Sequence, residues 1–177
     1  MLKQVLAIGF VTALLSGCAS LPKAPETPSD FANKVQISNS KFDKDTKFTG
    51  YTITKHKVGL LPASTSYFLR SWKNKQTGRL KHQLYLSFNY FGDWRFYNSA
   101  SFDDAKQISA TEIDRDVVFC SSGYCNLKED IGVSLSDKFL RSKMKQGFSI
   151  RINSKKASSE IINVSSHYIK GYLSVVK

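Results

Sequence analysis

Apolar and polar residues alternate along most of the chain after residue 50, a pattern typical of β-strands that bury one face. The clearest alternation spans residues 80–91, where Leu84, Leu86, Phe88 and Tyr90 share one face. Similar patterns predict further strands over residues 51–54, 67–72, 94–102, 116–120, 125–127, 131–135, 148–152 and 161–164. The last two of these strands flank a polar stretch and predict a hairpin.

Residues 80–91 and 94–102 are expected to pair as one hairpin around the turn residues 91–93. A two-residue loop would set an apolar row of the first strand opposite a mostly polar row of the second. A three-residue loop instead pairs Phe88 with Phe96, since a slip of one residue exchanges the two faces of a strand. We therefore expect the odd-length loop or a β-bulge.

Two segments have helical spacing instead of alternation. Ser136 is a suitable N-cap for a helix that continues to residue 146 and stops at Gly147. A second helix is expected over residues 167–176, where apolar residues recur at helical spacing. Together these patterns predict an α+β fold, mainly an antiparallel β-sheet or sandwich with one or two short helices packed on it.

The first 17 residues have the organisation of a secretory signal. A short amino-terminal region with one positive charge, Lys3, precedes an apolar run over residues 5–14. This run of about ten residues is too short to cross a hydrocarbon core of about 30 Å as a helix. We therefore expect residues 1–17 to be a signal peptide that is removed, and the residues that follow indicate a lipoprotein signal peptide.

The signal ends in Leu15-Ser16-Gly17-Cys18, which resembles the lipobox of bacterial lipoproteins. In that family the cysteine is diacylated, the signal is cleaved before it, and the new amino group is acylated. By position the lipidated residue is Cys18, and two or three acyl chains together hold a protein stably on a membrane. Ala19 follows instead of Asp, which resembles the Gram-negative pattern for the outer membrane. The alternative is a chance cysteine in an ordinary signal or an anchor helix.

Residues 18–48 are expected to form a tether between the lipidated cysteine and the domain. Three of the four prolines of the chain lie within seven residues of this segment, a composition typical of a semi-stiff linker. Residues 31–48 are polar with isolated apolar residues, and they are either more tether or an edge strand laid on the domain. A single periplasmic β-rich domain is then expected over residues 49–177.

Cys120 and Cys125 remain as an even pair once Cys18 is lipidated. Because cysteines outside the cytoplasm meet an oxidising compartment, a disulfide is expected between them. The alternatives are a redox pair or half a metal site, although the spacing is not Cys-x-x-Cys and no histidine stands nearby.

Basic residues outnumber acidic ones, 26 to 14, and the excess lies in two parts of the expected domain. Residues 49–102 and 131–177 each carry a net charge of +7, whereas residues 103–130 carry −4. The candidate anion-binding residues come from both basic parts: Arg70, Lys73, Lys75, Arg79, Lys81, Lys138, Arg141, Lys143, Lys145 and Arg151. Such residues attract an anionic lipid, the phosphates of lipopolysaccharide or an acidic envelope protein. The alternative is a basic surface that is merely solvated.

Aromatic residues accompany the first basic part, and they include Trp72, Tyr85, Tyr90, Phe91, Trp94 and Tyr97. Basic and aromatic residues interleaved on a sheet are also typical of nucleic-acid binding. A lipidated protein outside the cytoplasm rarely meets nucleic acid, so we expect none as a partner. The aromatic residues either stack on sugars or belong to the core.

Common catalytic and metal-binding motifs are absent from the sequence. The three histidines have no metal-ligand spacing with one another or with an acidic residue: His56, His82 and His167. No G-x-S-x-G, phosphate-binding glycine loop or H-E-x-x-H motif occurs. Glu112, Asp114 and Asp116 alternate, and they form either a cation site or a solvated acidic edge. We therefore expect no catalytic residue, no metal and no cofactor.

The body of the chain resembles a loose group of uncharacterised proteobacterial lipoproteins over about residues 66–177. The resemblance is carried by the aromatic segment 84–97, Val117-Val118-Phe119-Cys120 with Cys125 and Glu129, and the ending Tyr168-Ile169-Lys170-Gly171-Tyr172-Leu173. It implies an envelope lipoprotein and supplies no activity.

We therefore expect an outer-membrane lipoprotein, facing the periplasm, with a non-catalytic binding or scaffolding domain. Its expected partner is an anionic envelope component or another envelope protein. The alternatives are a carrier of a small apolar ligand or lipid, and an envelope hydrolase whose site is assembled from distant residues. Inhibition of lysozyme would pair a basic protein with a basic enzyme, which electrostatics disfavours.

Overall fold

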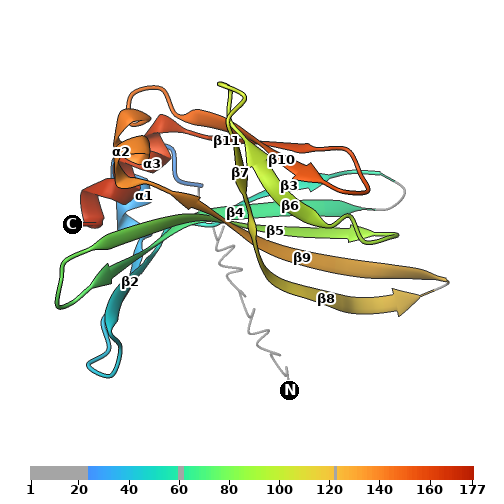
Figure 1. The fold of residues 1–177 in the computed structure, drawn as a ribbon, viewed down its shortest axis with the longest axis horizontal. Helices are drawn as coiled ribbons and strands as arrows, with labels where there is room; N and C mark the ends of the chain where they lie inside the picture. Colours follow the sequence, from blue (N-terminus) through green and yellow to red (C-terminus); the bar gives the residue numbers. More distant parts are fainter. Residues whose placement is uncertain (1–23, 60–61, 122) are drawn as a thin grey trace, which may run out of the picture.

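The computed structural model describes residues 24–59, 62–121 and 123–177, which form two antiparallel sheets and three helices (Figure 1). The larger sheet has the order β1 (Gln36–Ser38), β2 (Asp45–Thr49), β4 (Ala63–Asn74), β5 (Leu80–Phe91), β9 (Tyr124–Leu135), β8 (Thr111–Ser121), with β3 (Ile53–Lys57) also paired to β4. The smaller sheet has the order β11 (Glu160–Val164), β10 (Phe148–Ser154), β6 (Tyr97–Ser101), β7 (Gln107–Ser109). The helices are α1 (Pro28–Asn33), α2 (Asp137–Ser142) and α3 (Ser166–Val175).

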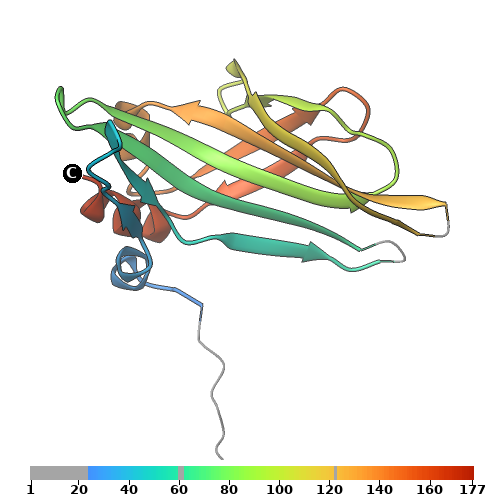
Figure 2. The same cartoon turned by 90° about the horizontal axis from the view of Figure 1, so that it is seen from below.

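This architecture confirms the α+β fold expected from the alternation of apolar and polar residues. Buried and partly exposed residues alternate over residues 64–72 of β4 and 82–91 of β5. The smaller sheet and the helices lie on one face of the larger sheet, with the helices gathered at one end (Figures 1 and 2). Because none of the described elements covers the opposite face, the side chains there meet solvent. We call it the open face.

Helix α3 is joined to the larger sheet by tyrosine hydroxyls as well as by apolar contacts. The Tyr168 hydroxyl accepts a hydrogen bond from the Leu69 backbone N–H at 2.9 Å and donates one to the Tyr51 carbonyl at 2.8 Å. A side chain at Gly50 would meet that hydroxyl, since its Cβ would lie 2.5 Å from the oxygen. Gly50 therefore lets the helix approach the sheet closely. Ser165 caps α3, which begins and ends within one residue of the expected helix.

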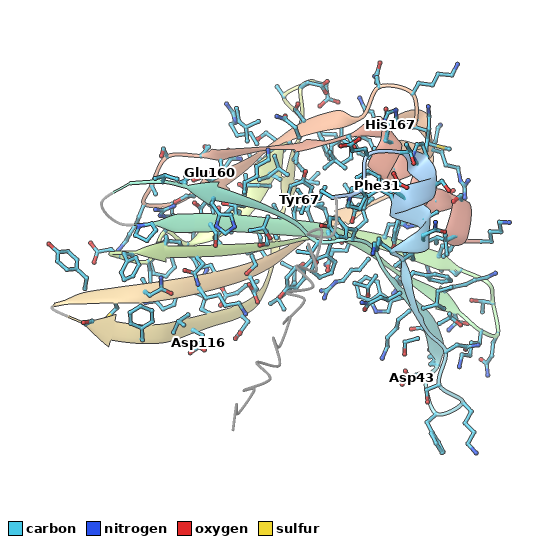
Figure 3. All side chains as sticks on the ribbon, turned by 180° about the vertical axis from the view of Figure 1, so that it is seen from behind. Phe31, Asp43, Tyr67, Asp116, Glu160 and His167 are labelled. Carbon is cyan, nitrogen blue, oxygen red and sulfur yellow. A yellow bond between two sulfur atoms is a disulfide. The ribbon has the colours of Figure 1, made fainter. Side chains whose placement is uncertain are left out.

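The segment before residue 49 corrects one expectation from the sequence. Residues 28–48 are not tether: they form α1, β1 and β2, and Phe31 and Phe48 are buried in the core. Helix α1 packs so closely on α3 that a Cβ at Gly171 would lie 2.3 Å from the Pro28 carbonyl oxygen. Figure 3 shows Phe31 among the helices, at the opposite end of the molecule from Asp116 on β8. Of the two alternatives for residues 31–48, the strand laid on the domain holds.

The hairpin expected between residues 80–91 and 94–102 is wrong. Strand β5 pairs with β4 and β9, whereas β6 lies in the smaller sheet beside β10 and β7. The chain therefore crosses between the sheets, through backbone with positive φ at Gly92 (112°) and Phe96 (56°). Phe88 and Tyr97 do lie together, stacked with ring centroids 4.0 Å apart, but across the core and not within one sheet.

A buried carboxylate explains why the chain takes this route. Glu129 on β9 is fully buried and accepts hydrogen bonds from three successive backbone N–H groups, residues 95–97, at 3.0–3.2 Å. It also accepts from the Tyr90 hydroxyl and from Arg115 Nε. Burial alone would raise the pKa of Glu129, but these hydrogen bonds outweigh it and hold the pKa below the ordinary value. The crossover is thus fixed by an ionised side chain from a neighbouring strand.

The remaining sequence-based elements differ in extent. Residues 125–127 and 131–135 belong to the single strand β9, and the strand expected over 116–120 extends to Thr111–Ser121. Ser136 caps α2 as expected, but the helix ends at Ser142, and turns continue to Gly147 at a φ of 74°. The expected hairpin of β10 and β11 is present.

Candidate functional site

The two groups of candidate anion-binding residues do not form one surface. Lys81 and His82 are neighbours on β5 and so point to opposite faces of the larger sheet. His82 Nε2 lies 3.2 Å from Asp137 of α2, which places that helix on the covered side and Lys81 on the open face. Arg151 is exposed on the smaller sheet, where it lies opposite Ile161 of β11. The candidates are therefore divided among three surfaces.

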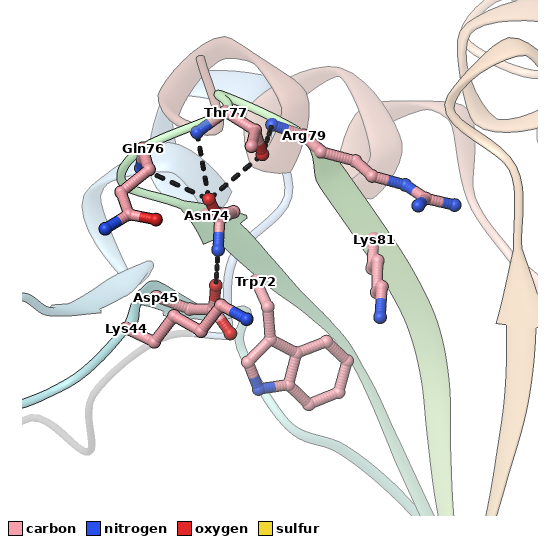
Figure 4. Close-up of a pocket in the computed structure, with 8 residues that line it drawn as sticks. All are labelled: Lys44, Asp45, Trp72, Asn74, Gln76, Thr77, Arg79 and Lys81. Atoms are coloured by element: carbon pink, nitrogen blue, oxygen red, sulfur yellow. Dashed lines mark hydrogen bonds between the residues drawn. The ribbon is translucent and has the colours of Figure 1, made fainter.

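Two residues of the first group, Arg79 and Lys81, line a cavity at the end of the β4–β5 hairpin. The cavity has a volume of about 370 Å³ and is open to solvent. Figure 4 shows the side chains that line it: Lys44, Asp45, Trp72, Asn74, Gln76, Thr77, Arg79 and Lys81. We call it the Trp72 cavity. Three cations and one carboxylate line it, so its charge favours an anion.

Asn74 organises the rim of the Trp72 cavity. Its amide nitrogen donates to Asp45 Oδ1 at 3.1 Å, and its amide oxygen accepts from the backbone N–H groups of Gln76 and Thr77 at 3.1 and 2.9 Å. The Thr77 hydroxyl donates to the same oxygen at 2.9 Å. The turn is thus held in shape, and the Asp45 carboxylate is already engaged by an amide.

Trp72 lies between two lysines because of the strand register. Lys47 of β2 is its partner on one side and Lys81 of β5 on the other. The Arg70 guanidinium lies over the indole at 4.9 Å from the ring centroid, a cation–π contact that fixes the ring. An aromatic platform flanked by cations suits a ligand that has both an apolar ring face and a negative charge.

The contacts of Arg70 continue into an aromatic stack across the open face. Its guanidinium also lies 4.6 Å from the ring centroid of Tyr85, and Tyr85 stacks on Phe68 at 4.7 Å. Arg70 Nε donates to Gln83 Oε1 at 2.8 Å. The Tyr85 hydroxyl donates to Asp130 at 2.6 Å, and burial together with this carboxylate raises the pKa of Tyr85, so the phenol stays neutral.

The aromatic residues singled out in the sequence separate in the same way. Tyr90 and Tyr97 are buried in the core, and Trp94 packs against it. Trp72 and Tyr85 lie on the open face, so the core alternative holds for Tyr90 and Tyr97 but not for these two, for which stacking on sugars stays a prediction. Phe91 meets Phe119 edge-on at 5.7 Å, near the end of the β8–β9 hairpin.

Several of the other candidate cations are engaged by the protein itself. Lys75 donates to the Ser40 carbonyl, and Arg141 pairs with Asp137 at 2.7 Å. Lys143 lies over the Phe139 ring at 5.7 Å. The sequence did not indicate Lys44, because this residue reaches the cavity from the loop between β1 and β2.

A serine, a histidine and an aspartate form a chain of two hydrogen bonds beneath α3. Ser71 Oγ is 2.7 Å from His82 Nδ1, and His82 Nε2 is 3.2 Å from Asp137 Oδ1. Ser71 and His82 are buried, and Ser71 Oγ is also 2.6 Å from the Tyr172 hydroxyl. Burial lowers the pKa of His82, which favours the neutral ring. The Ser71 hydroxyl is buried and contacts both His82 and Tyr172, so it joins helix α3 to the larger sheet. A catalytic nucleophile would instead need access to a substrate.

The same region bears on the carrier alternative. Tyr168 and Tyr172 fill the space between α3 and the larger sheet, and both are fully buried. Five cavities among the described residues are open to solvent and are lined by other residues. Between α3 and the sheet, the space at this point is occupied by the two tyrosines.

The expected disulfide between Cys120 and Cys125 is present, with an S–S length of 2.02 Å. The two cysteines are cross-strand partners at the end of the β8–β9 hairpin. On β8, Glu112 pairs with Arg115 at 2.6 Å. Among the described residues, no group of three histidine, cysteine, aspartate or glutamate side chains is placed to hold a metal ion.

Cys18 and the signal segment lie outside the described residues. Within the described part of the chain, no helix has the length and apolar character needed to cross a bilayer. Comparisons with protein-family models, curated proteins and solved structures found no match to this chain.

Proposed function

We propose that this protein is a lipid-anchored envelope lipoprotein whose domain binds an anionic envelope component, without chemistry, at the Trp72 cavity. The observation that supports the site is the meeting of Lys44, Arg79 and Lys81 around one fixed indole ring. The lipobox-like sequence ending at Cys18 supports the anchor and the compartment.

The ligand chemistry follows from the side chains at the site. Lysine and arginine bind phosphate and carboxylate through charge-assisted hydrogen bonds, which are about twice as strong as neutral ones. The Asp45 carboxylate already accepts a hydrogen bond from the Asn74 amide, which weakens the repulsion between this carboxylate and an incoming anion. The shared chemistry is a phosphate or carboxylate group, carried by a saccharide or by a lipid headgroup.

Charge reversal at the cavity tests this proposal. The cavity variant is Arg79→Glu with Lys81→Glu, and its matched control is Lys138→Glu with Lys145→Glu, which makes the same change in net charge at exposed positions near α2. Calorimetry of the full chain in detergent would measure binding of delipidated, phosphorylated lipopolysaccharide core oligosaccharide. A parallel arm would measure sedimentation with phosphatidylglycerol vesicles.

We expect the cavity variant to lose about tenfold or more in affinity, because two charge-assisted contacts disappear. The control should change by no more than about twofold, as expected for exposed charges away from the ligand. Binding in the calorimetry arm would identify a saccharide as the source of the anion, and binding in the vesicle arm would identify a lipid headgroup. Equal losses in both variants, or no binding to either probe, would contradict a site at this cavity.

A further inference from the structure

We propose that the open face of the larger sheet is a binding strip for an oligosaccharide with one acidic end, whose acidic end occupies the Trp72 cavity. The inference rests on the proposed function and names its ligand class. The following sugars would extend from the cavity along β4 and β5, over the stacked side chains and past Gln83 toward Asn89.

The side chains along this strip suit sugar hydroxyl groups. Outward from Trp72, the positions on β4 and β5 carry amides and hydroxyls beside the aromatic stack: Ser64, Ser66, Gln83, Ser87 and Asn89. Amides and hydroxyls both donate and accept hydrogen bonds, as sugar hydroxyls require. The apolar ring faces of the aromatic stack lie beside these polar groups, and sites for small ligands usually combine the two in this way.

The strip is rigid before any ligand arrives. Arg70 is held at once by Trp72, Tyr85 and Gln83, and Tyr85 is held by Phe68. Gln83 in turn lies over Gly132, where a Cβ would come within 2.2 Å of its amide nitrogen. Side chains that are already ordered lose little entropy on binding, so even weak contacts along the strip add to affinity.

The distribution of charge favours a ligand with its charge at one end. The cations of the Trp72 cavity lie at the hairpin end. At the other end, the partner of Asn89 is Lys128, which pairs with Asp130 at 2.7 Å, and Asp114 and Asp116 of β8 lie beside this pair. A uniformly acidic polymer would therefore meet no excess of positive charge at the far end of the strip. In a ligand with one acidic group followed by neutral sugars, the cations of the cavity attract the acidic group. The polar side chains beyond the cavity form hydrogen bonds with the sugars.

The strip is long enough for several sugars. From Lys81, which pairs with Trp72, to Asn89 is a run of eight residues along β5, or about 27 Å at the usual rise per residue of a strand.

Chain-length dependence of affinity tests the inference. The probes are gluconic acid, cellobionic acid and cellotetraonic acid, which carry one carboxylate and an increasing number of neutral sugars. Neutral cellotetraose is the uncharged control. Titration calorimetry of the full chain should give an affinity that rises about tenfold from gluconic to cellotetraonic acid, with cellotetraose weaker than cellotetraonic acid by a similar factor.

Variants separate this inference from the proposed function. In Ser87→Ala and Asn89→Ala, affinity for gluconic acid should stay within about twofold of wild type, while the gain with chain length decreases. Asn163→Ala, exposed on β11 of the smaller sheet, is the matched control and should keep that gain. Thermal melting monitors folding, and the two strip variants are independent, so a fold defect in one leaves the other informative.

The contradicting outcomes differ for the two claims. Wild-type affinity that does not rise with chain length would overturn the strip and leave the anion site in the cavity intact. Cellotetraose binding as tightly as cellotetraonic acid would overturn the acidic anchor. If the wild type is a dimer that dissociates in both strip variants, a second copy is the occupant of the strip and the inference is overturned. Loss of vesicle binding in both strip variants would overturn it as well.

Discussion

Glu129 shows how one side chain determines the path of the backbone. It is fully buried, ionised and bonded to the backbone of residues 95–97, where β5 would otherwise have continued into a hairpin. Five donors reach its two oxygens, because Tyr90 and Arg115 also contribute. The crossover that joins the two sheets therefore depends on a carboxylate about 30 residues later in the sequence.

Removing that carboxylate should be costly. In Glu129→Ala we expect the free energy of unfolding to fall by about 3–5 kcal/mol, because Arg115 and three backbone N–H groups lose their buried acceptor. Glu112→Ala is the matched control, since Glu112 pairs with the same Arg115 but is exposed, and it should cost less than about 1 kcal/mol. Urea unfolding measures both values. Equal losses would mean that Glu129 has no special role.

His82 makes the stability depend on pH. Burial lowers its pKa in the folded protein below the ordinary histidine value of about 6.5, so the unfolded chain takes up the proton first as the pH falls. The stability that its neutral ring contributes is complete above the unfolded pKa and is lost as the pH falls through the folded pKa.

We therefore expect the free energy of unfolding to decrease between about pH 7 and pH 5, and His82→Gln to flatten that decrease. Denaturant unfolding across this range measures the slope, which stays informative even if the substitution lowers stability at every pH. His56→Gln, at an exposed position, is the control and should keep the wild-type slope. A wild-type slope in His82→Gln would show that another group is responsible.

At the scale of elements, the β8–β9 hairpin depends on its disulfide and on its edge charges. Val117, Val118 and Phe119 are each about half exposed at the end of β8, whose other edge has no partner strand among the described residues. Register shifts near Glu112 and Val117 interrupt this edge, and charged residues occupy it. Both features discourage pairing with another chain.

Replacing Cys120 and Cys125 with serine should loosen this end of the hairpin most. The closed loop is short, so chain entropy predicts a loss of about 2 kcal/mol in global stability. Hydrogen exchange should accelerate most for amides near Val117 and Leu127, whereas the amide of Val133 in the covered part of β9 should accelerate by no more than the loss in global stability. Acceleration as large at Val133 would contradict a local role.

Alternation of apolar and polar residues predicted the strands well because burial follows the pleat directly. It predicted β5 without error in its bounds, since both faces of that strand keep a strict alternation over Leu80–Phe91. It failed for the connection to β6, because pairing partners depend on contacts such as those of Glu129, which local pattern does not contain.

The candidate site was predictable only in part, for a similar reason. Arg79, Lys81 and Trp72 lie close in sequence because they belong to one hairpin, whereas Lys44 comes from a separate one. A local signal for α1 was present in the sequence: Thr27 and Asp30 form a capping box around Pro28, the usual start of a helix.

At the scale of the whole molecule, we propose an anchor at Cys18 and a domain whose open face carries the binding site. Cys18→Ser should abolish labelling by radioactive palmitate and release the protein from the membrane fraction, because two or three acyl chains supply stable anchoring. Cys120→Ser is the matched cysteine control and should keep the label. A wild type that takes up no palmitate would contradict the anchor.

Backbone amide chemical shifts would show directly whether a ligand binds at the Trp72 cavity. The full chain, labelled with ¹⁵N in detergent, would be titrated with the delipidated, phosphorylated core oligosaccharide. We predict shift changes concentrated in Trp72, Asn74 and residues 76–81, with the exposed positions of α2 unchanged. Changes centred on α2 or on β8, or spread evenly over all basic residues, would contradict it.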